Sequence, residues 1–146
     1  MSSTTLRLPL AVVSACLLGR ACRYDGRHKL VPTLRAELLR RGFHVLALCP
    51  ETGAGLPVPR PPMDLHRLPD GTVRCLRQDG TDLTPALDAW IDATICRLRP
   101  LAPSLFILKS KSPSCGLLLD PPGLFADAAR RAFPSARFLD EHALPL

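Results

Sequence analysis

Val12-Val13-Ser14-Ala15-Cys16-Leu17-Leu18-Gly19 places a cysteine directly after a short apolar segment, and two more cysteines occupy equivalent positions. Residues 43–48 lead into Cys49, and residues 105–108 lead into Ser112-Pro113-Ser114-Cys115-Gly116. Short apolar runs of this kind predict buried β-strands. If the three strands are parallel neighbours, their carboxyl ends share one edge of a sheet, where open α/β sheets bind ligands. The pattern therefore predicts that three thiols converge at a metal site.

A helix is predicted between the first two strands. Over residues 31–41, Leu34, Leu38 and Leu39 share one helical face, and Gly42 follows in a C-cap position. The first part of the chain is therefore a strand, helix, strand unit.

The middle of the chain predicts a loop, a hairpin and a second helix. The glycines and prolines of residues 53–62 favour an ordered loop beside the site. Residues 73–77 and 81–83 resemble a hairpin around Asp79-Gly80. Thr84-Pro85 is typical of a helix start, and that helix extends to about residue 99.

The whole order predicts an α/β fold. A last helix over residues 124–133 and a last strand over residues 136–139 complete it. With 146 residues, the chain is most simply one domain over residues 1–146, large enough to bury a core without disulfides. We expect a single-domain three-layer sandwich with a mostly parallel, Rossmann-like sheet, although neither a Rossmann fingerprint nor a P-loop occurs.

Composition favours a cytoplasmic protein with an anionic small-molecule partner. Six cysteines without dense spacing suit a reducing compartment better than a disulfide framework. The net charge of +6 fits a nucleotide or a phosphate, but the 19 basic residues are scattered, and no Lys/Arg block marks a nucleic-acid surface.

The amino terminus allows an alternative interpretation. Residues 8–15 are apolar, and Val13-Ser14-Ala15-Cys16 resembles a lipoprotein cleavage site with Cys16 acylated. The run is short for a signal peptide, and Cys49 and Cys115 follow equivalent strands without such an explanation. No other segment approaches the roughly 20 apolar residues of a membrane-spanning helix, so no membrane partner is expected.

The chemistry of the three cysteines favours an iron-sulfur cluster. A structural zinc site normally uses cysteines paired a few residues apart, whereas Cys16, Cys49 and Cys115 are isolated from one another. Thiolates from three loops suit a cluster whose fourth iron lacks a protein ligand. The alternative is that all three are ordinary buried cysteines. Cys22 lies close enough to Cys16 to supply a fourth ligand.

The remaining cysteines are expected to be structural. Cys96 is predicted in the core beside Trp90 and Ile91, and Cys75 lies in the hairpin without ligand neighbours.

Polar residues near these cysteines are candidates for the chemistry. Glu51 follows Cys49 by two residues and could move protons at a bound substrate, or it could only cap its loop or pair with Arg60. Ser112 and Ser114 could donate hydrogen bonds to a substrate or only shape a turn. Lys109, Arg23 and Arg60 are candidates for binding an anion, and the alternative is that these side chains are only solvated.

Taken together, the motifs resemble the thiouracil desulfidase (TudS) family. The resemblance rests on residues 14–19, Cys22-Arg23-Tyr24-Asp25-Gly26, Cys49-Pro50-Glu51, residues 56–62, Leu108-Lys109 and residues 112–116. It implies a [4Fe-4S] cluster held by Cys16, Cys49 and Cys115, whose open iron binds the sulfur of a thiolated base. It also implies catalytic roles for Glu51 and Ser112 in a hydrolytic, non-redox desulfuration.

The chain departs from the family pattern at three places. Ala54 replaces a usual glycine, Asp64 replaces a usual Glu, and the connection after Cys115 is shortened around Asp120-Pro121-Pro122-Gly123. We expect the shortened connection to form part of the wall over the cluster, which affects the size of the substrate.

The resemblance implies a thiolated nucleobase or nucleotide as substrate, thiouracil or 4-thiouridine monophosphate, and we expect a monomer or a weak homodimer. The alternative is a non-catalytic carrier of an iron-sulfur cluster or a metal, in which Glu51 is structural.

Overall fold

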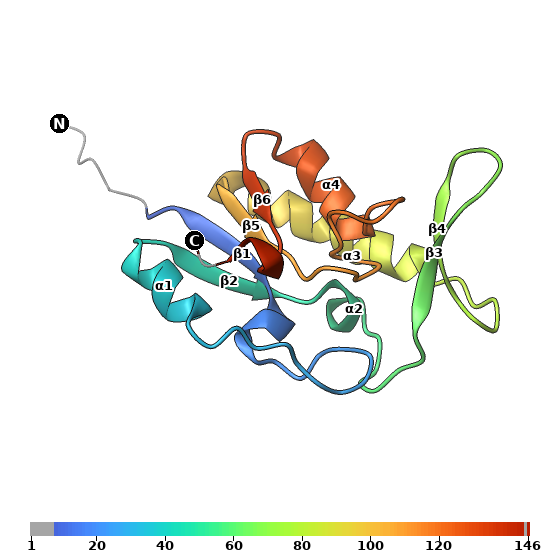
Figure 1. The fold of residues 1–146 in the computed structure, drawn as a ribbon. Helices are drawn as coiled ribbons and strands as arrows, with labels where there is room; N and C mark the ends of the chain where they lie inside the picture. The colour runs from blue at the N-terminus through green and yellow to red at the C-terminus, as the bar shows by residue number, and fades with distance from the viewer. Residues whose placement is uncertain (1–7, 145) are drawn as a thin grey trace.

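The computed structural model describes residues 8–144 and 146. At its centre is a four-stranded sheet in the order β2-β1-β5-β6 (Figure 1). The strands are Leu10–Ser14 (β1), His44–Leu48 (β2), Leu105–Ile107 (β5) and Arg137–Leu139 (β6). All three pairings in this sheet are parallel, as predicted, so the four carboxyl ends point to one edge.

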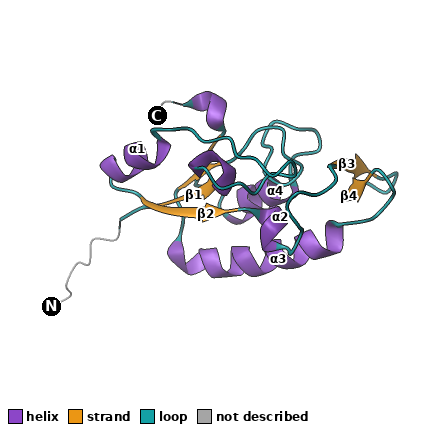
Figure 2. Cartoon of the chain, turned by 90° about the horizontal axis from the view of Figure 1, so that it is seen from below, coloured by secondary structure: helices purple, strands orange, loops and turns teal. Residues whose placement is uncertain are grey.

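Helices cover both faces of the sheet (Figure 2). α1 (Leu34–Arg40) lies on one face, and α3 (Thr84–Leu98) and α4 (Leu124–Ala132) lie on the other. Because side chains alternate along a strand, Val12 belongs to the core under α3 and α4, while Ala11 and Val13 belong to the core under α1. The predicted three-layer α/β architecture is confirmed.

The helices largely follow the predicted ranges. α3 and α4 each end one residue before the predicted end, whereas α1 begins three residues later than predicted. The reason is that the Val31 N–H donates to the Leu17 carbonyl and ties this segment to the turn after β1. The prediction that Leu39 shares the apolar face with Leu34 and Leu38 was wrong, since Leu39 is 55% exposed. One residue after Leu38, it lies about 100° around the helix from the buried face.

The predicted hairpin has a different second strand. β4 (Val73–Arg77) pairs antiparallel with β3 (Met63–Arg67), not with residues 81–83. Residues 81–83 contribute only an isolated bridge between Leu76 and Asp82, because the chain already turns into α3 there. The two-stranded hairpin projects from the body of the molecule (Figure 1).

Four short helical turns complete the described chain, and three of them flank the site described below: Ala15–Leu18 (η1), Pro50–Gly53 (α2), Arg99–Leu101 (η2) and Glu141–Ala143 (η3). The prediction that Cys96 is a core residue was wrong, because it is exposed on α3. Ile91 and Ile95 face the core, and Cys96 lies about 100° away from Ile95. Within the described part of the chain, no helix is long and apolar enough to cross a membrane.

Candidate metal centre and active site

The strand order places the three predicted cysteines at a topological switch point. The chain runs from β1 to β2 on one side and later returns to β5 on the other side of β1, and such a reversal opens a crevice at the carboxyl ends. Cys16 lies in the turn after β1, Cys49 directly follows β2, and Cys115 lies in the loop after β5. The prediction that these thiols reach one edge is confirmed.

A cavity of about 660 Å³ opens at this edge. Cys16, Cys22, Cys49 and Cys115 all line it. The other segments around it are residues 14–15, 23–24, 29, 48, 50–51, 60, 62–64, 109–114 and 141–142. All nine residues that we predicted for the site line this one cavity.

The shortened connection after Cys115 lies behind the cysteine loop. Residues 117–123 are not among the residues that line the cavity, so the expectation that they form its wall was wrong. The Gly123 N–H donates to the Gly116 carbonyl at 2.8 Å. A Cβ atom on Gly123 would lie 2.6 Å from the backbone carbon of Ser114, so only glycine allows this close approach.

Burial is the main influence on the pKa of the Cys16 and Cys115 thiols. It raises the pKa of Cys16 to about 11, with the nearby Cys49 adding to the effect. It raises the pKa of Cys115 to about 12, although a hydrogen bond with the Ser14 side chain acts in the opposite direction. Without a bound cation, both thiols are therefore protonated at neutral pH, and each would release its proton on binding a metal as a thiolate.

Cys22 and Cys49 form a hydrogen-bonded thiol pair. The bond with Cys22 lowers the pKa of Cys49 to about 6, and hydrogen bonds from Thr52 act in the same direction. The same bond raises the pKa of Cys22. The Cys49 Sγ also lies 3.9 Å from the Cys22 carbonyl oxygen. Cys49 is therefore the thiol of this cavity that ionises most readily, and Cys22 is its proton-bearing partner.

The separation of the thiols from one another distinguishes a site for a single metal ion from a site for an iron-sulfur cluster. Among residues 8–144 and 146, no three His, Cys, Asp or Glu side chains lie close enough to hold a single metal ion. In an iron-sulfur cluster, each cysteine binds a different iron, so the sulfurs lie farther apart than ligands of one ion. Sulfur ligands on three separate loops around one cavity fit a cluster better than a zinc ion.

Glu51 and Arg60 form a buried ion pair in the cavity wall. The Arg60 Nη2 and Nε donate to Glu51 Oε1 at 2.7 and 3.0 Å. Arg60 Nη2 also donates to the Cys22 carbonyl at 2.9 Å, which links the carboxylate to the cysteine loop. Glu51 is placed by α2, where Gly53 packs directly against the indole of Trp90 in α3. Arg60 therefore binds Glu51 instead of standing free for a substrate anion.

Ser112 and Ser114 connect to the free oxygen of Glu51. Ser114 Oγ donates to Glu51 Oε2 at 2.8 Å, and Ser112 Oγ lies 3.0 Å from Ser114 Oγ. Since the only hydroxyl hydrogen of Ser114 points to Glu51, Ser112 is the donor of that second bond. Ser112 Oγ in turn accepts the backbone N–H groups of Ser114 and Cys115. The turn-forming and hydrogen-bonding roles predicted for these serines therefore coexist.

The cationic side chains around the cavity fall into two groups. Arg23 pairs with Asp25 at 3.4 Å, and Lys109 pairs with Glu141 at 2.9 Å. Lys29 and Lys111 also line the cavity, and no ion pair joins either of them to a described carboxylate. Sequence reasoning selected Arg23, Lys109 and Arg60 and missed these two lysines, because whether a loop cation finds a carboxylate depends on the conformation of the loop.

Glu141 is a third residue of the cavity that sequence reasoning missed. It lies in η3 at the carboxy-terminal end of the described chain, follows β6 and reaches the same cavity. Its position behind the last parallel strand was the available signal, because that strand ends on the same edge as the cysteines.

Comparisons with known proteins agree with this geometry. A model of the family described as 2-thiouracil desulfurase matches residues 11–138. The uncharacterized protein YbbK of Bacillus subtilis (strain 168) is 32% identical over 112 residues, 73% of each chain. Among solved structures, the [4Fe-4S]-dependent thiouracil desulfidase TudS (DUF523Vcz) is similar, with a TM-score of 0.75 and 30% identity over 94% of this chain and 93% of that one.

Proposed function

Because the chain belongs to the 2-thiouracil desulfurase family, we propose that it removes sulfur from a thiolated pyrimidine and releases the oxo base and sulfide. The observation that carries this proposal is the convergence of Cys16, Cys49 and Cys115 on one cavity that also contains Glu51. Substrate and water supply all the atoms: the C=S group and H₂O become C=O and H₂S. No net electron transfer is needed, so the reaction is hydrolytic.

We expect Cys16, Cys49 and Cys115 to hold a [4Fe-4S] cluster. Their sulfur donors, their separate loops and their spacing fit such a group, and the solved structure described as a [4Fe-4S]-dependent thiouracil desulfidase has a similar fold. When bound, a cluster with one iron free of protein ligands supplies a Lewis acid for the thiocarbonyl sulfur. Cys22 remains the hydrogen-bond partner of Cys49 in this arrangement.

We propose that Glu51 relays the protons. Arg60 holds Oε1, so Glu51 keeps a fixed carboxylate at the cavity wall, and Oε2 receives its hydrogen bond from Ser114. A carboxylate in this position can accept a proton from an attacking water as a general base and return it to the departing sulfur. Arg60 is then a positioning residue for Glu51.

We propose that Ser112 connects Glu51 to the cavity. The hydrogen bonds run from Ser112 Oγ to Ser114 Oγ and from Ser114 Oγ to Glu51 Oε2. When Glu51 takes the Ser114 proton, Ser114 can take that of Ser112, and Ser112 can take one from a water in the cavity. The two serines thus extend the reach of a carboxylate that is itself only 8% exposed.

The substrate is the finer part of the proposal. A cavity of about 660 Å³ is large enough for a pyrimidine base or its nucleotide. Lys29 and Lys111, which have no ion-pair partner among the described residues, favour 4-thiouridine monophosphate over free thiouracil because they can receive a phosphate.

The test is anaerobic reconstitution with iron and sulfide, followed by the thione absorbance of 4-thiouracil and 4-thiouridine monophosphate and an assay of released sulfide. We expect cluster-dependent loss of the thione band. Glu51→Gln should keep the cluster and lower kcat about 10²- to 10⁴-fold, the usual contribution of a positioned acid or base.

Glu37→Gln is the matched control. Like Glu51, Glu37 pairs with arginine, in its case Arg40 and Arg41, but it lies on α1 outside the cavity lining. Its substitution should leave turnover unchanged. Full sulfide release by Glu51→Gln would remove Glu51 from the mechanism. A stable cluster without any loss of the thione band would favour the carrier alternative.

A further inference from the structure

The segment after the last strand reaches into the cavity through one carboxylate. We propose that Glu141 is a positioning residue of the active site, which holds the Lys109 ammonium in the cavity wall and fixes the start of the loop that carries Ser112, Ser114 and Cys115. Glu141 lies outside the residues matched by the family model, 11–138. The kinetic part of this inference rests on the proposed desulfidase function.

Glu141 makes three contacts with two consecutive residues. Its Oε1 accepts the Ser110 backbone N–H at 2.8 Å, and its Oε2 accepts the Ser110 hydroxyl at 2.9 Å. The Lys109 Nζ lies 2.9 Å from the same Oε2. Burial alone would raise the pKa of Glu141, but the hydrogen bonds from Lys109 and Ser110 lower it to about 2. The carboxylate is therefore ionised throughout the neutral range.

The turn that carries Glu141 is itself well anchored. The Asp140 side chain accepts the His142 N–H at 2.8 Å and caps η3. β6 precedes this cap directly and pairs with β5, so Glu141 lies two residues after the edge strand of the sheet. The Leu108 N–H donates to the Leu139 carbonyl at 2.8 Å, one residue beyond the paired strands. Through its contacts with Lys109 and Ser110, Glu141 thus ties residues 109–110 to the edge of the sheet.

Residues 109–110 are held from two sides. Opposite Glu141, the Lys109 N–H donates to Ser14 Oγ at 2.9 Å, and Ser14 closes β1 directly before the cysteine turn. The Lys109 side chain is only 16% exposed, and its Nζ also donates to the Ser110 carbonyl at 2.8 Å. Lys109 and Cys16 line the same cavity.

The Glu141–Lys109 pair therefore fixes an ammonium in the wall of the cavity that Cys16 also lines. Lys111, two residues further, is exposed and has no described carboxylate partner, so its side chain is not fixed in this way. A fixed ammonium can stabilise negative charge at the cavity without reorganising, whereas a mobile one must first be ordered. The contact with Glu141 is what distinguishes the fixed ammonium of Lys109 from that of Lys111.

Amine labelling tests the structural half of the inference. The full chain is treated with a limiting amine-reactive ester, and the labelled lysines are identified by peptide mass spectrometry. In the unaltered chain, Lys109 should react at least fivefold more slowly than Lys29 and Lys111. Glu141→Gln should bring Lys109 close to the rate of Lys111, and Glu37→Gln should leave all three rates unchanged. Unchanged protection of Lys109 in Glu141→Gln overturns the inference.

A double-mutant cycle tests the functional half. Gln can still accept the Ser110 N–H, so Glu141→Gln removes mainly the interaction with Lys109. We expect it to lower kcat/KM about tenfold in the reconstituted enzyme and less than twofold in a Lys109→Met background. An equal loss in both backgrounds, or no loss in either, overturns the inference. The two proposals fail separately. A chain inactive on every thio-substrate would refute the proposed function, whereas the labelling experiment needs no turnover and would still test the contact between Glu141 and Lys109.

Discussion

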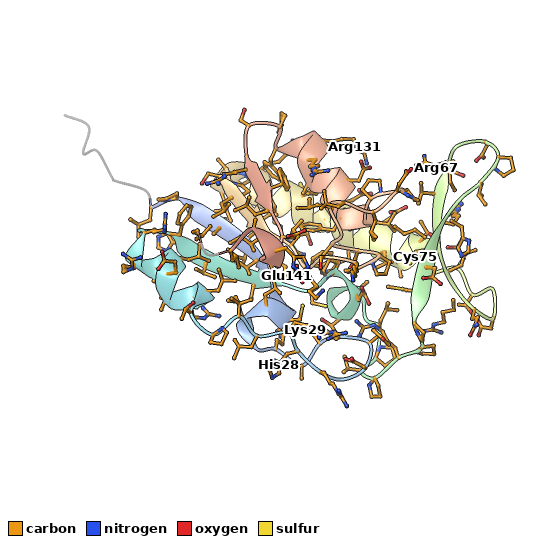
Figure 3. The ribbon with its side chains drawn as sticks, in the orientation of Figure 1. His28, Lys29, Arg67, Cys75, Arg131 and Glu141 are labelled. Carbon is orange, nitrogen blue, oxygen red and sulfur yellow. The ribbon has the colours of Figure 1, made fainter. Side chains whose placement is uncertain are left out.

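The carboxyl edge of the parallel sheet and the β3–β4 hairpin both contain a buried cysteine, but they use it differently. At the sheet edge, Cys115 faces a cavity with three other cysteines. In the hairpin, Cys75 is fully buried, its N–H donates to Thr84 Oγ1 at 2.7 Å, and it packs in the main core. Figure 3 shows Cys75 at the hairpin and Glu141 in the body of the molecule.

The difference follows from strand direction. Parallel strands send all their following loops to one edge, so residues distant in sequence meet there. In an antiparallel pair the ends alternate, and only the first residues of β3, Met63 and Asp64, reach the cavity. Burial of a thiol alone is therefore no sign of function in this molecule. What matters is whether the thiol lies at the common edge.

The largest effect should separate the cysteines of these two regions. We expect Cys16→Ala, Cys49→Ala or Cys115→Ala to abolish the brown colour of the anaerobically purified protein, because each would remove one of the three proposed cluster ligands. Cys75→Ala and Cys96→Ala should keep the colour. Iron and sulfide analysis with the visible spectrum measures this. Full clusters in all three edge variants would refute the assignment.

A second comparison concerns thiol ionisation at the edge and in the hairpin. In the cluster-free chain, the alkylation rate of Cys49 should follow a titration near pH 6, because the hydrogen bond with Cys22 lowers its pKa to about 6. Burial raises the pKa of Cys75 to about 12, so Cys75 should stay unlabelled below pH 9. A lowered pKa means that Cys49 is a thiolate above pH 6 and loses reactivity as the pH falls below it.

Cys22→Ala sharpens this comparison. It removes the hydrogen bond and should move the midpoint for Cys49 toward the ordinary thiol value of about 8.5. Alkylation with iodoacetamide across a pH series, followed by peptide mapping, gives both midpoints. If the midpoint stayed near 6 in Cys22→Ala, Cys22 would not be the group that activates Cys49.

Most of the fold could be read from the sequence because its signals are local. Apolar runs and helix caps gave the parallel strands, α3 and α4 within a residue or two, and the motif resemblance is confirmed by the family model over residues 11–138. β3 was missed because its exposed residues break the apolar pattern, and Cys96 was misplaced because a rotation of 100° along a helix separates core from solvent.

The site was predictable in its cysteines but not in its charges. Sequence position showed that Cys16, Cys49 and Cys115 follow strands, and parallel pairing then placed them together. The ion pairs of the cavity depend on loop conformations that no periodic pattern encodes. They join Arg23 to Asp25, Arg60 to Glu51 and Lys109 to Glu141. This is why Lys29, Lys111 and Glu141 emerged only from the structure.

The smallest expected effect is on the free energy of unfolding. It compares the loss of two ion pairs between an arginine and a carboxylate, one at the sheet edge and one on the hairpin. Arg60 and Glu51 have side chains 3% and 11% exposed, whereas Arg67 of β3 and Asp120 are 52% and 94% exposed. Arg60→Met leaves a buried carboxylate without its partner, which should cost about 3 kcal/mol. Arg67→Met breaks a pair screened by water, which should cost about 0–1 kcal/mol.

The measurement is the melting temperature of both variants beside the unaltered chain, under one buffer and cluster state. Arg60→Met should melt about 10 °C lower, and Arg67→Met within about 3 °C, given the usual relation between stability and melting temperature for a domain of this size. Because both variants exchange the same residue types, differences in side-chain entropy largely cancel. Equal losses would mean that the Glu51 carboxylate finds another partner or water once Arg60 is gone, and the cavity wall would then be less rigid than its hydrogen bonds indicate.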